Sequence, residues 1–467
     1  MARFFKYHST DDLAAENTRL GLDLRFSDDL APLFKPKSVA GRRVGNSLCI
    51  QPMEGCDGTA DGKPDELVYR RYRRFGAGGA KLIWGEAAAV VEEGRATPRQ
   101  LWVCEANRAE FARIVRECRE AHGAVYDDDS DLLLGLQLTH SGRYSHPKPL
   151  IAVRDPLLDP RHKVIDGAYP VLSDDYLARL VDHYVAAAKL AHDVGFDFVD
   201  VKQCHRYLLN ELLSAKTRSG RYGGSLENRT RLARDIIAAI RANVPGLIIA
   251  VRINVFDGIP FNMGANGDGE PCAWRPPVQT AFGTREDDPF TPDRTEPIAW
   301  IEEMRGLGVA LVNVSMGNPY ASPHIIRPFE YPPPDGYESP EHPLIGVDRH
   351  FRLTAEVQRR FPDLSIVGSG YSYLQEFLPQ AAAANLRDSR VTFAGIGRAS
   401  LAQPDFIQQL REHGRLDRKR VCRTFSYCTA LMRSKHNELG QFATGCPPFD
   451  KEVYGPIWQE ALHTKPK

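Results

Sequence analysis

The chain has 467 residues, of which 42% are hydrophobic and 26% are charged, and its 60 basic side chains balance its 60 acidic ones. This composition is typical of a globular protein, and the balanced charge gives no electrostatic reason to expect a nucleic-acid or anionic-membrane partner. Because no apolar run reaches the length of a membrane span, the start MARFFKYHSTDDLAAE has no apolar signal region, and the nine cysteines are scattered, we expect a cytoplasmic protein with free thiols.

Eight short apolar runs recur along the chain, and a helical pattern follows each of them. The runs are rich in Val, Ile and Leu, as expected for parallel strands that are buried on both faces. They are SLCIQP (47–52), KLIWGEAAA (81–89), LLLGLQL (132–138), FDFVDVK (196–202), LIIAVRI (247–253), VALVNVS (309–315), LSIVG (364–368) and TFAGI (392–396).

The clearest helical patterns follow the third and fourth runs. One begins at Ser173, a residue type that caps helix starts, places Leu177 and Tyr184 on one face and ends near Gly195. Another begins at Ser225. Eight strand–helix alternations predict an α/β protein with a (β/α)8 TIM barrel. An open doubly wound sheet is the less favoured alternative, because no Gly-x-Gly-x-x-Gly motif opens the first helix.

Three segments exceed a minimal barrel. Residues 257–297 and 317–348 are rich in Gly, Pro and Asp and follow the fifth and sixth strands, so we expect long loops at the carboxyl rim, either lids over a site or plain surface insertions. Residues 415–467 form a C-terminal extension. The expected organisation is an N-terminal arm (1–30), a barrel domain (31–414) and this extension.

The ends of the last two strands resemble a phosphate site. The seventh strand ends in Gly368, Ser369 and Gly370, and the eighth leads into Gly395, Gly397 and Arg398. Glycines let backbone N–H groups approach an oxyanion closely, and a guanidinium adds paired donors. Barrels often hold phosphate after these two strands.

Two other strand ends suggest what is attached to that phosphate. Gln137 and Arg252 end the third and fifth strands and would point into the mouth of the barrel. An amide can pair with the polar edge of a heterocycle, and a cation can stabilise negative charge on a reduced ring. Together with the phosphate site they predict a phosphorylated aromatic cofactor that lies across the barrel.

Four motifs carry a family resemblance: QLTHSGR (137–143), YGGSLENRTR within 196–232, VGSG (367–370) and GIGRASLAQPD (395–405). From about residue 31 to about residue 412 the chain resembles the old yellow enzyme family of flavin-dependent ene-reductases and their demethylating relatives. The resemblance implies non-covalently bound FMN with its phosphate at the seventh and eighth strands. We expect NADH or NADPH as the electron donor, or else a separate protein. The implied flavin contacts are Pro52, Met53, Glu54, Ala87, Gln137, Arg252, Gly370, Gly395, Gly397 and Arg398.

The same resemblance assigns substrate roles after the fourth strand. By position, Lys202 and His205 would hold a substrate oxygen, and Tyr207 would supply a proton. Lys202 replaces the usual histidine; it would either contact substrate or pair with Glu54 or Asp200.

Three further residues bear on the site around that segment. Arg206 replaces the usual glycine and would re-aim Tyr207 or narrow the pocket. Glu54 stands where relatives carry threonine or cysteine, and we expect it to be paired or protonated. Cys204 is expected to be a small buried residue.

The tail raises the question of a metal. Some longer relatives carry a four-cysteine iron–sulfur cluster after the barrel, whereas this segment has only Cys422, Cys428 and Cys446 and no C-x-x-C. We therefore expect a segment that keeps the fold without a metal site.

The leading functional hypothesis is an FMN-dependent oxidoreductase that transfers hydride from NAD(P)H to an activated C=C bond of a small, enone-like molecule. Three alternatives stay open: oxidative N-demethylation by the same flavin, a lyase with Lys202 as Schiff-base lysine, and a flavin protein without redox turnover. The sequence also leaves open whether the chain forms a homo-oligomer.

Overall fold

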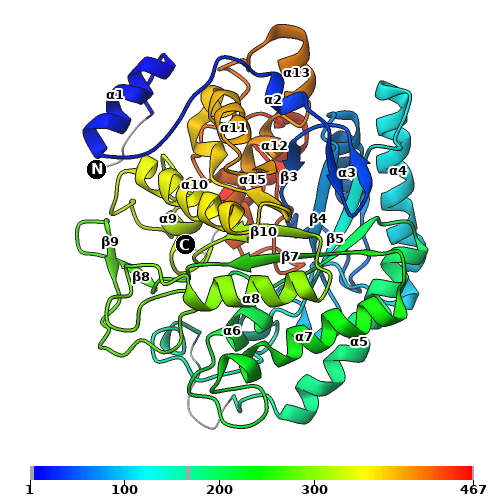
Figure 1. The fold of residues 1–467 in the computed structure, drawn as a ribbon, viewed down its shortest axis with the longest axis vertical. Helices are drawn as coiled ribbons and strands as arrows, with labels where there is room; N and C mark the ends of the chain where they lie inside the picture. Colours follow the sequence, from blue (N-terminus) through cyan, green and yellow to red (C-terminus); the bar gives the residue numbers. More distant parts are fainter. Residues whose placement is uncertain (1–4, 163, 165–168, 465–467) are drawn as a thin grey trace.

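The computed structural model describes residues 5–162, 164 and 169–464. Eight parallel strands close into a barrel in the order β10–β11–β12–β3–β4–β5–β6–β7, so the predicted (β/α)8 fold is confirmed (Figure 1). Every residue in these strands is buried, as expected where helices cover the outside and side chains fill the inside. The strands are β3 Leu48–Ile50, β4 Leu82–Ala89, β5 Leu133–Thr139, β6 Phe198–Val201, β7 Ile248–Asn254, β10 Leu311–Ser315, β11 Ser365–Gly368 and β12 Phe393–Ile396.

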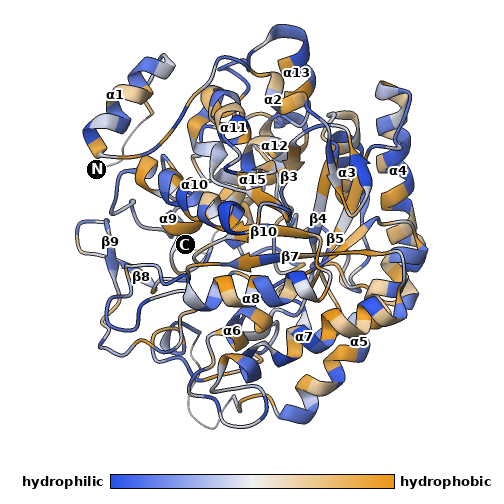
Figure 2. Ribbon diagram, in the orientation of Figure 1, coloured by the Kyte–Doolittle hydropathy of each residue, from blue (hydrophilic) through white to orange (hydrophobic). Residues whose placement is uncertain are grey.

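The helices surround the barrel with their apolar sides inward, and Figure 2 shows both colours on most of them. The predicted start at Ser173 is confirmed, since its hydroxyl accepts a hydrogen bond from the Tyr176 N–H. Ser225 caps the next long helix through Asn228 N–H. The outer helices are α3 Glu66–Ala77, α4 Arg108–Tyr126, α5 Asp174–Asp193, α7 Leu226–Asn243, α8 Thr295–Gly306, α10 Pro343–Arg360, α11 Leu378–Arg387 and α13 Phe406–His413.

The amino end of the barrel is closed by apolar side chains. A hairpin of β1 (Lys37–Val39) and β2 (Arg42–Val44) contributes Val39 and Val44 to a cluster that also includes Trp84 and Phe198. The rings of Trp84 and Phe198 meet edge to face at 5.1 Å. Because these side chains fill the amino end of the barrel, a ligand can enter only from the carboxyl ends of the strands.

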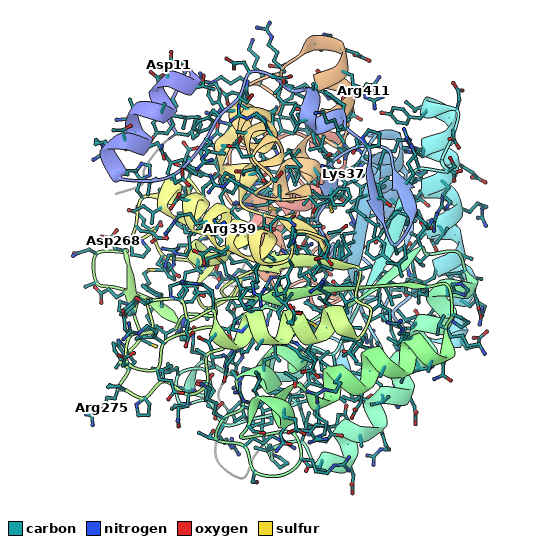
Figure 3. The ribbon with its side chains drawn as sticks, in the orientation of Figure 1. Asp11, Lys37, Asp268, Arg275, Arg359 and Arg411 are labelled. Atoms are coloured by element: carbon teal, nitrogen blue, oxygen red, sulfur yellow. The ribbon has the colours of Figure 1, made fainter. Side chains whose placement is uncertain are left out.

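The two predicted rim loops pack against each other over that carboxyl end. The first contains the hairpin β8 (Phe261–Met263) and β9 (Gly269–Pro271), and the second contains α9 (Pro323–Ile326). Phe261 and Tyr337 share a small apolar cluster with their ring centres 6.1 Å apart. The charged side chains Asp268 and Arg275 project outward from the first loop (Figure 3).

The segments on either side of the barrel pack against it. Apolar side chains of residues 5–30 and of the start of the tail join the main core, and Leu431, Phe442 and Ala461 form a core within the tail. No helix in the described part of the chain is both long and apolar enough to cross a membrane. The remaining elements are α1 Thr10–Leu20, α2 Ala31–Phe34, α6 Leu208–Leu213, α12 Arg398–Ala402, α14 Tyr427–Arg433, α15 Lys451–His463, and the 3-10 helices Glu92–Gly94, Glu105–Asn107, Gly142–Tyr144, Pro160–His162 and Tyr371–Phe377.

Candidate active site

A cavity of about 210 Å³ lies at the carboxyl ends of the barrel strands. The structure brings all of the predicted site residues except Gly368 together around it. Gly368 lies within β11, where a side chain would meet Val391. The predicted residues in the lining are Pro52, Met53, Glu54, Ala87, Gln137, Lys202, His205, Tyr207, Arg252, Ser369, Gly370, Gly395, Gly397 and Arg398.

Glycines at the carboxyl ends of β11 and β12, Gly370 after β11 and Gly395 within β12, bring the backbone close to the cavity. Gly370 has φ +100°, which L side chains rarely adopt, and a Cβ there would lie 2.9 Å from His350. A Cβ on Gly395 would lie 2.0 Å from the amide nitrogen of Gln51. Beside these turns, Arg398 donates through Nη2 to the Pro328 carbonyl at 2.6 Å, while its buried Nη1 has no partner within the described residues.

Asp200, a buried carboxylate at the end of β6, organises the opposite side of the cavity. It accepts hydrogen bonds from Trp84 Nε1 at 2.8 Å, from Gln137 Nε2 at 2.5 Å and from the Arg252 backbone N–H at 2.7 Å. Because the Gln137 nitrogen is engaged there, its amide oxygen is left for the cavity. Burial raises the pKa of Asp200 to about 6 against these three donors.

The guanidinium of Arg252 has no such partner. No described carboxylate lies within ion-pair distance of it, and its buried Nε has no hydrogen-bond acceptor among the described residues. Burial lowers the pKa of Arg252. A buried cation without an anion is costly, so this group indicates a site for a ligand with negative charge or electron-rich atoms.

Lys202 lies on the ring of Tyr207, with Nζ 3.6 Å from the ring centre. Burial lowers the pKa of this lysine. No described carboxylate pairs with Lys202, and Asp200 is occupied by the donors already named, so neither ion pair considered from the sequence is formed. The ammonium is therefore available to a ligand in the cavity.

His205 and Tyr207 complete the polar group at the end of β6. His205 Nε2 lies 2.9 Å from Ser315 Oγ, and burial, with Arg252 and Lys202 nearby, holds its pKa well below the ordinary value. The imidazole is thus neutral at physiological pH. The Tyr207 hydroxyl lies 3.2 Å from that of Tyr320, and burial keeps its pKa well above the usual range, so Tyr207 stays protonated.

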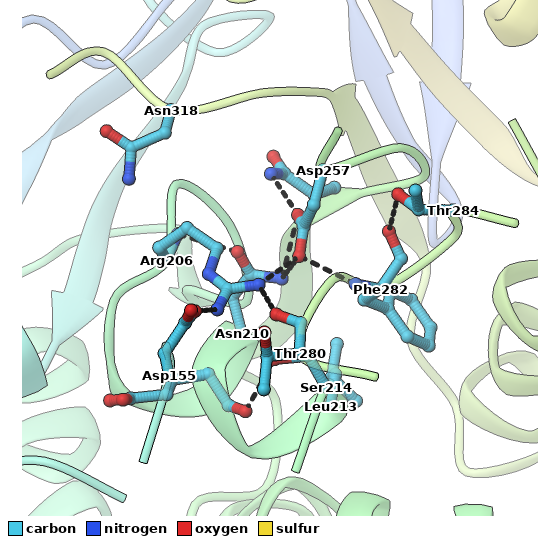
Figure 4. A network of polar contacts seen from close by, with 12 residues as sticks. Asp155, Arg206, Asn210, Leu213, Ser214, Asp257, Thr280, Phe282, Thr284 and Asn318 are labelled. Carbon is cyan, nitrogen blue, oxygen red and sulfur yellow. Dashed lines mark hydrogen bonds and ion pairs between the residues drawn. The ribbon is translucent and has the colours of Figure 1, made fainter. Parts of the chain in front are cut away.

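Arg206, between these two residues, is not part of the cavity lining; Figure 4 shows its guanidinium among Asp155, Asp257 and Thr280. Its guanidinium pairs with Asp155 at 2.5 Å and Asp257 at 3.0 Å and donates to the Thr280 carbonyl, while its backbone N–H donates to Asn210. These contacts join three separate segments of the chain. Arg206 therefore anchors the first rim loop to the segment after β6 and does not narrow the cavity.

Glu54 is the acidic side chain in the cavity lining. Burial raises its pKa to about 7, although the charge of Lys202 acts in the opposite direction. It is therefore partly protonated at neutral pH, one of the two states expected from the sequence. Cys204 is fully buried and burial raises its pKa to about 12, so its thiol is not a nucleophile.

The sequence reasoning missed two sources of lining residues. The second rim loop provides Tyr320 and Arg327, and the tail provides Cys428 and Thr429 together with Met432 and Thr444. The only local signal for the tail was its cysteines. In the described parts of the chain no cluster of His, Cys, Asp or Glu side chains is arranged to hold a metal ion.

Comparisons with known proteins agree with this architecture. The sequence profile of the NADH:flavin oxidoreductase / NADH oxidase family matches residues 32–265. The NADPH dehydrogenase of Geobacillus sp. (strain WCH70) is 31% identical over 232 residues, which are 49% of this chain and 64% of the relative. That of Bacillus subtilis (strain 168) is 29% identical over 234 residues, 48% and 64% of the two chains. The matched region thus spans less than two thirds of these relatives.

Solved structures show the same fold at low identity. An old yellow enzyme homologue from Zymomonas mobilis has a TM-score of 0.59 at 22% identity, covering 84% of this chain and 96% of that one. A 2-naphthoyl-CoA reductase in complex with 2-naphthoyl-CoA has a TM-score of 0.66 at 17% identity, covering 92% and 58%. The resemblance to old yellow enzymes is confirmed, and since the family profile covers half of the sequence, the chain belongs to the NADH:flavin oxidoreductase / NADH oxidase family.

Proposed function

We propose that the protein binds FMN and reduces an activated C=C bond of a small, enone-like molecule with electrons from NADH or NADPH. One observation carries this proposal: Arg252 and Arg398, two buried guanidinium groups without carboxylate partners in the described structure, line one cavity. A single ligand with an anionic end and an electron-rich ring would satisfy both.

The residues present fit FMN. Arg398 and the turns at Gly370, Gly395 and Gly397 would hold the phosphate, since backbone N–H groups and a guanidinium fork both suit phosphate oxygens. The amide oxygen of Gln137 and the guanidinium of Arg252 would bind the polar edge of the ring. Bound FMN would supply the hydride-carrying centre that side chains lack.

The residues after β6 would act on the substrate. Lys202 and His205 would donate hydrogen bonds to its carbonyl oxygen, where negative charge grows during reduction, and such donors stabilise the transition state more than the bound substrate. Tyr207, kept protonated by burial, would deliver a proton to the carbon next to that carbonyl. The Tyr320 hydroxyl, 3.2 Å from that of Tyr207, would hold the donor in position.

A second candidate is a Schiff-base lyase that uses Lys202. The observation in its favour is the lowered pKa of this buried lysine, because a neutral amine is the nucleophile in such enzymes. This candidate leaves the partnerless Arg252 without a role, which is why we rank it second.

None of the nine cysteines forms a disulfide in the structure, which bears on the cellular compartment. Unpaired thiols support our proposal that the protein works in a reducing compartment such as the cytoplasm.

The test is spectroscopic. We expect the purified full-length chain, supplemented with FMN if needed, to show a flavin spectrum that NADH or NADPH bleaches without oxygen. Cyclohexenone should restore the colour, and cyclohexanone, which lacks the C=C bond, should not. Bleaching by a methylated amine would instead indicate demethylation. A chain that binds no flavin, and is inactivated by borohydride with a carbonyl compound, would overturn the proposal in favour of the lyase.

A further inference from the structure

Arg327, in the second rim loop just after α9, lines the same cavity as Arg398. Its Nη2 donates to the Pro319 carbonyl at 3.3 Å, and its Nη1 donates to Thr429 Oγ1 in the tail helix α14. Its Nε is buried and has no acceptor among the described residues. The side chain therefore joins the rim loop to the tail and still has an unused donor.

Arg327 and Arg398 are close neighbours. Arg398 donates to the carbonyl of Pro328, the residue next to Arg327. Burial, followed by the positive charge of Arg398, lowers the pKa of Arg327 to about 9. In the described structure no carboxylate lies within ion-pair distance of either guanidinium. Arg398 is buried, and Arg327 is half-buried with its Nε fully covered. Two adjacent cations in such a place are unfavourable unless a ligand brings negative charge.

We propose that Arg327 is a second phosphate-binding arginine, which forms a clamp with Arg398 on the phosphate of FMN and is held in position by Thr429. This inference rests on the proposed function. A phosphate monoester carries close to two negative charges at neutral pH, which matches two guanidinium groups. Each guanidinium also has a free, buried N–H, at Arg327 Nε and Arg398 Nη1, and forked donors suit phosphate oxygens.

The clamp gives the C-terminal extension a role. Thr429, Cys428, Met432 and Thr444 bring the tail to the cavity. The bond from Arg327 to Thr429 is the polar link to the rim loop that lies at the cavity; other links, such as Ser426 Oγ to the Tyr331 carbonyl and Arg433 to Asp335, lie outside the lining. The tail would thus be a positioning element of the cofactor site, which assembles fully only when α14 is docked at the rim loop.

The experiment compares FMN with riboflavin, which has the same ring and no phosphate, by quenching of flavin fluorescence on the full-length chain after flavin removal. Loss of charged hydrogen bonds predicts that Arg327→Ala weakens FMN binding by about tenfold to a hundredfold and leaves riboflavin binding unchanged. Arg327→Lys should give an intermediate loss, because it keeps the charge without the fork. Thr429→Val should weaken FMN binding several-fold, and Thr429→Ser, which keeps the hydroxyl, should bind FMN as tightly as the parent.

The matched control is Arg420→Ala, an exposed tail arginine that pairs with Asp405 at 2.9 Å and should change neither affinity. If Arg327→Ala fails to fold, Thr429→Val carries the test alone. If Arg327→Ala weakens FMN and riboflavin binding equally, or changes neither, the clamp is overturned while the proposed function stands. If flavin binding is unchanged but the KM for the enone substrate rises, Arg327 contacts the substrate instead. A parent chain that binds neither flavin would overturn the proposed function and the clamp with it.

Discussion

Two groups of buried arginines in this protein differ in one respect. Arg206, which anchors the first rim loop, has two carboxylate partners, Asp155 at 2.5 Å and Asp257 at 3.0 Å. In the cavity, Arg252 has none within the described structure. A buried cation with carboxylate partners needs no ligand, whereas one without them leaves a desolvation cost that a ligand can offset. Buried arginines with carboxylate partners therefore stabilise the fold, and those without such partners indicate a site for an anionic ligand.

The turn after β6 supplies one side chain to each place, His205 to the cavity and Arg206 to the ion pairs. His205 and Arg206 both have positive φ, 66° and 63°, so the backbone reverses and sends neighbouring side chains to opposite sides. The family pattern has glycine at position 206, where positive φ is free of strain. Arginine at this position costs roughly 1–2 kcal/mol of backbone strain, which its ion pairs with Asp155 and Asp257 offset.

The largest effect we expect is on stability. Arg206→Ala leaves Asp155 and Asp257 buried without their cation, which should lower the free energy of unfolding by about 3–5 kcal/mol, measured by urea denaturation. The control Arg305→Ala removes an exposed arginine that pairs with Asp363 at 3.0 Å and should cost less than about 1 kcal/mol. A loss for Arg206→Ala as small as the control's would show that the network does not hold the loops.

Substitution of the next residue, Tyr207, should change turnover, whereas substitution of Arg206 changes stability. Tyr207→Phe removes the proposed proton donor, so turnover should fall by about a hundredfold, measured as the rate of flavin reoxidation by cyclohexenone. The rate of flavin reduction by NADPH should stay as in the parent. An equal fall in both rates would assign Tyr207 to general packing and would remove the contrast with Arg206.

Arg252→Met tests the other side of the comparison. Removing an unpaired buried charge should raise the free energy of unfolding of the flavin-free protein by about 2–3 kcal/mol, while flavin binding weakens. Arg206→Met, at a paired arginine, should destabilise under the same urea titration. If both methionine variants lower stability, Arg252 has a partner in solution and the distinction between the two groups fails.

The fold and most of the cavity were predictable from the sequence for a simple physical reason. Parallel strands buried on both faces appear as continuous apolar runs such as FDFVDVK, and residues directly after them must lie at one rim. The family motif YGGSLENRTR identified the fold without lining the cavity: Ser225 caps α7, and Arg229 pairs with Glu296 on α8 at 2.6 Å. A specific motif is thus not necessarily a functional one.

What the sequence did not reveal comes from segments far along the chain. Tyr320 and Thr429 reach the cavity because a rim loop and the tail fold over it, and no local pattern reports such long-range packing. The expectation that Arg206 narrows the pocket was wrong for a related reason: its partners Asp155 and Asp257 lie in other loops, so only the structure could show that it stays out of the cavity lining.

The smallest expected effect concerns Glu54, the acidic member of the cavity lining. Burial raises its pKa to about 7, so the folded state favours the protonated acid more than the unfolded chain does. The resulting stability is fully present below the ordinary pKa of about 4.5 and is lost as the pH rises through about 7. Glu54→Gln should remove this loss, raising the free energy of unfolding of the flavin-free protein by about 1–2 kcal/mol at pH 8.5 and little at pH 5. Urea titrations at the two pH values measure the difference. A loss of stability with Gln that is the same at both would mean that Glu54 is ionised throughout and paired with Lys202, which would place a carboxylate partner in the cavity after all.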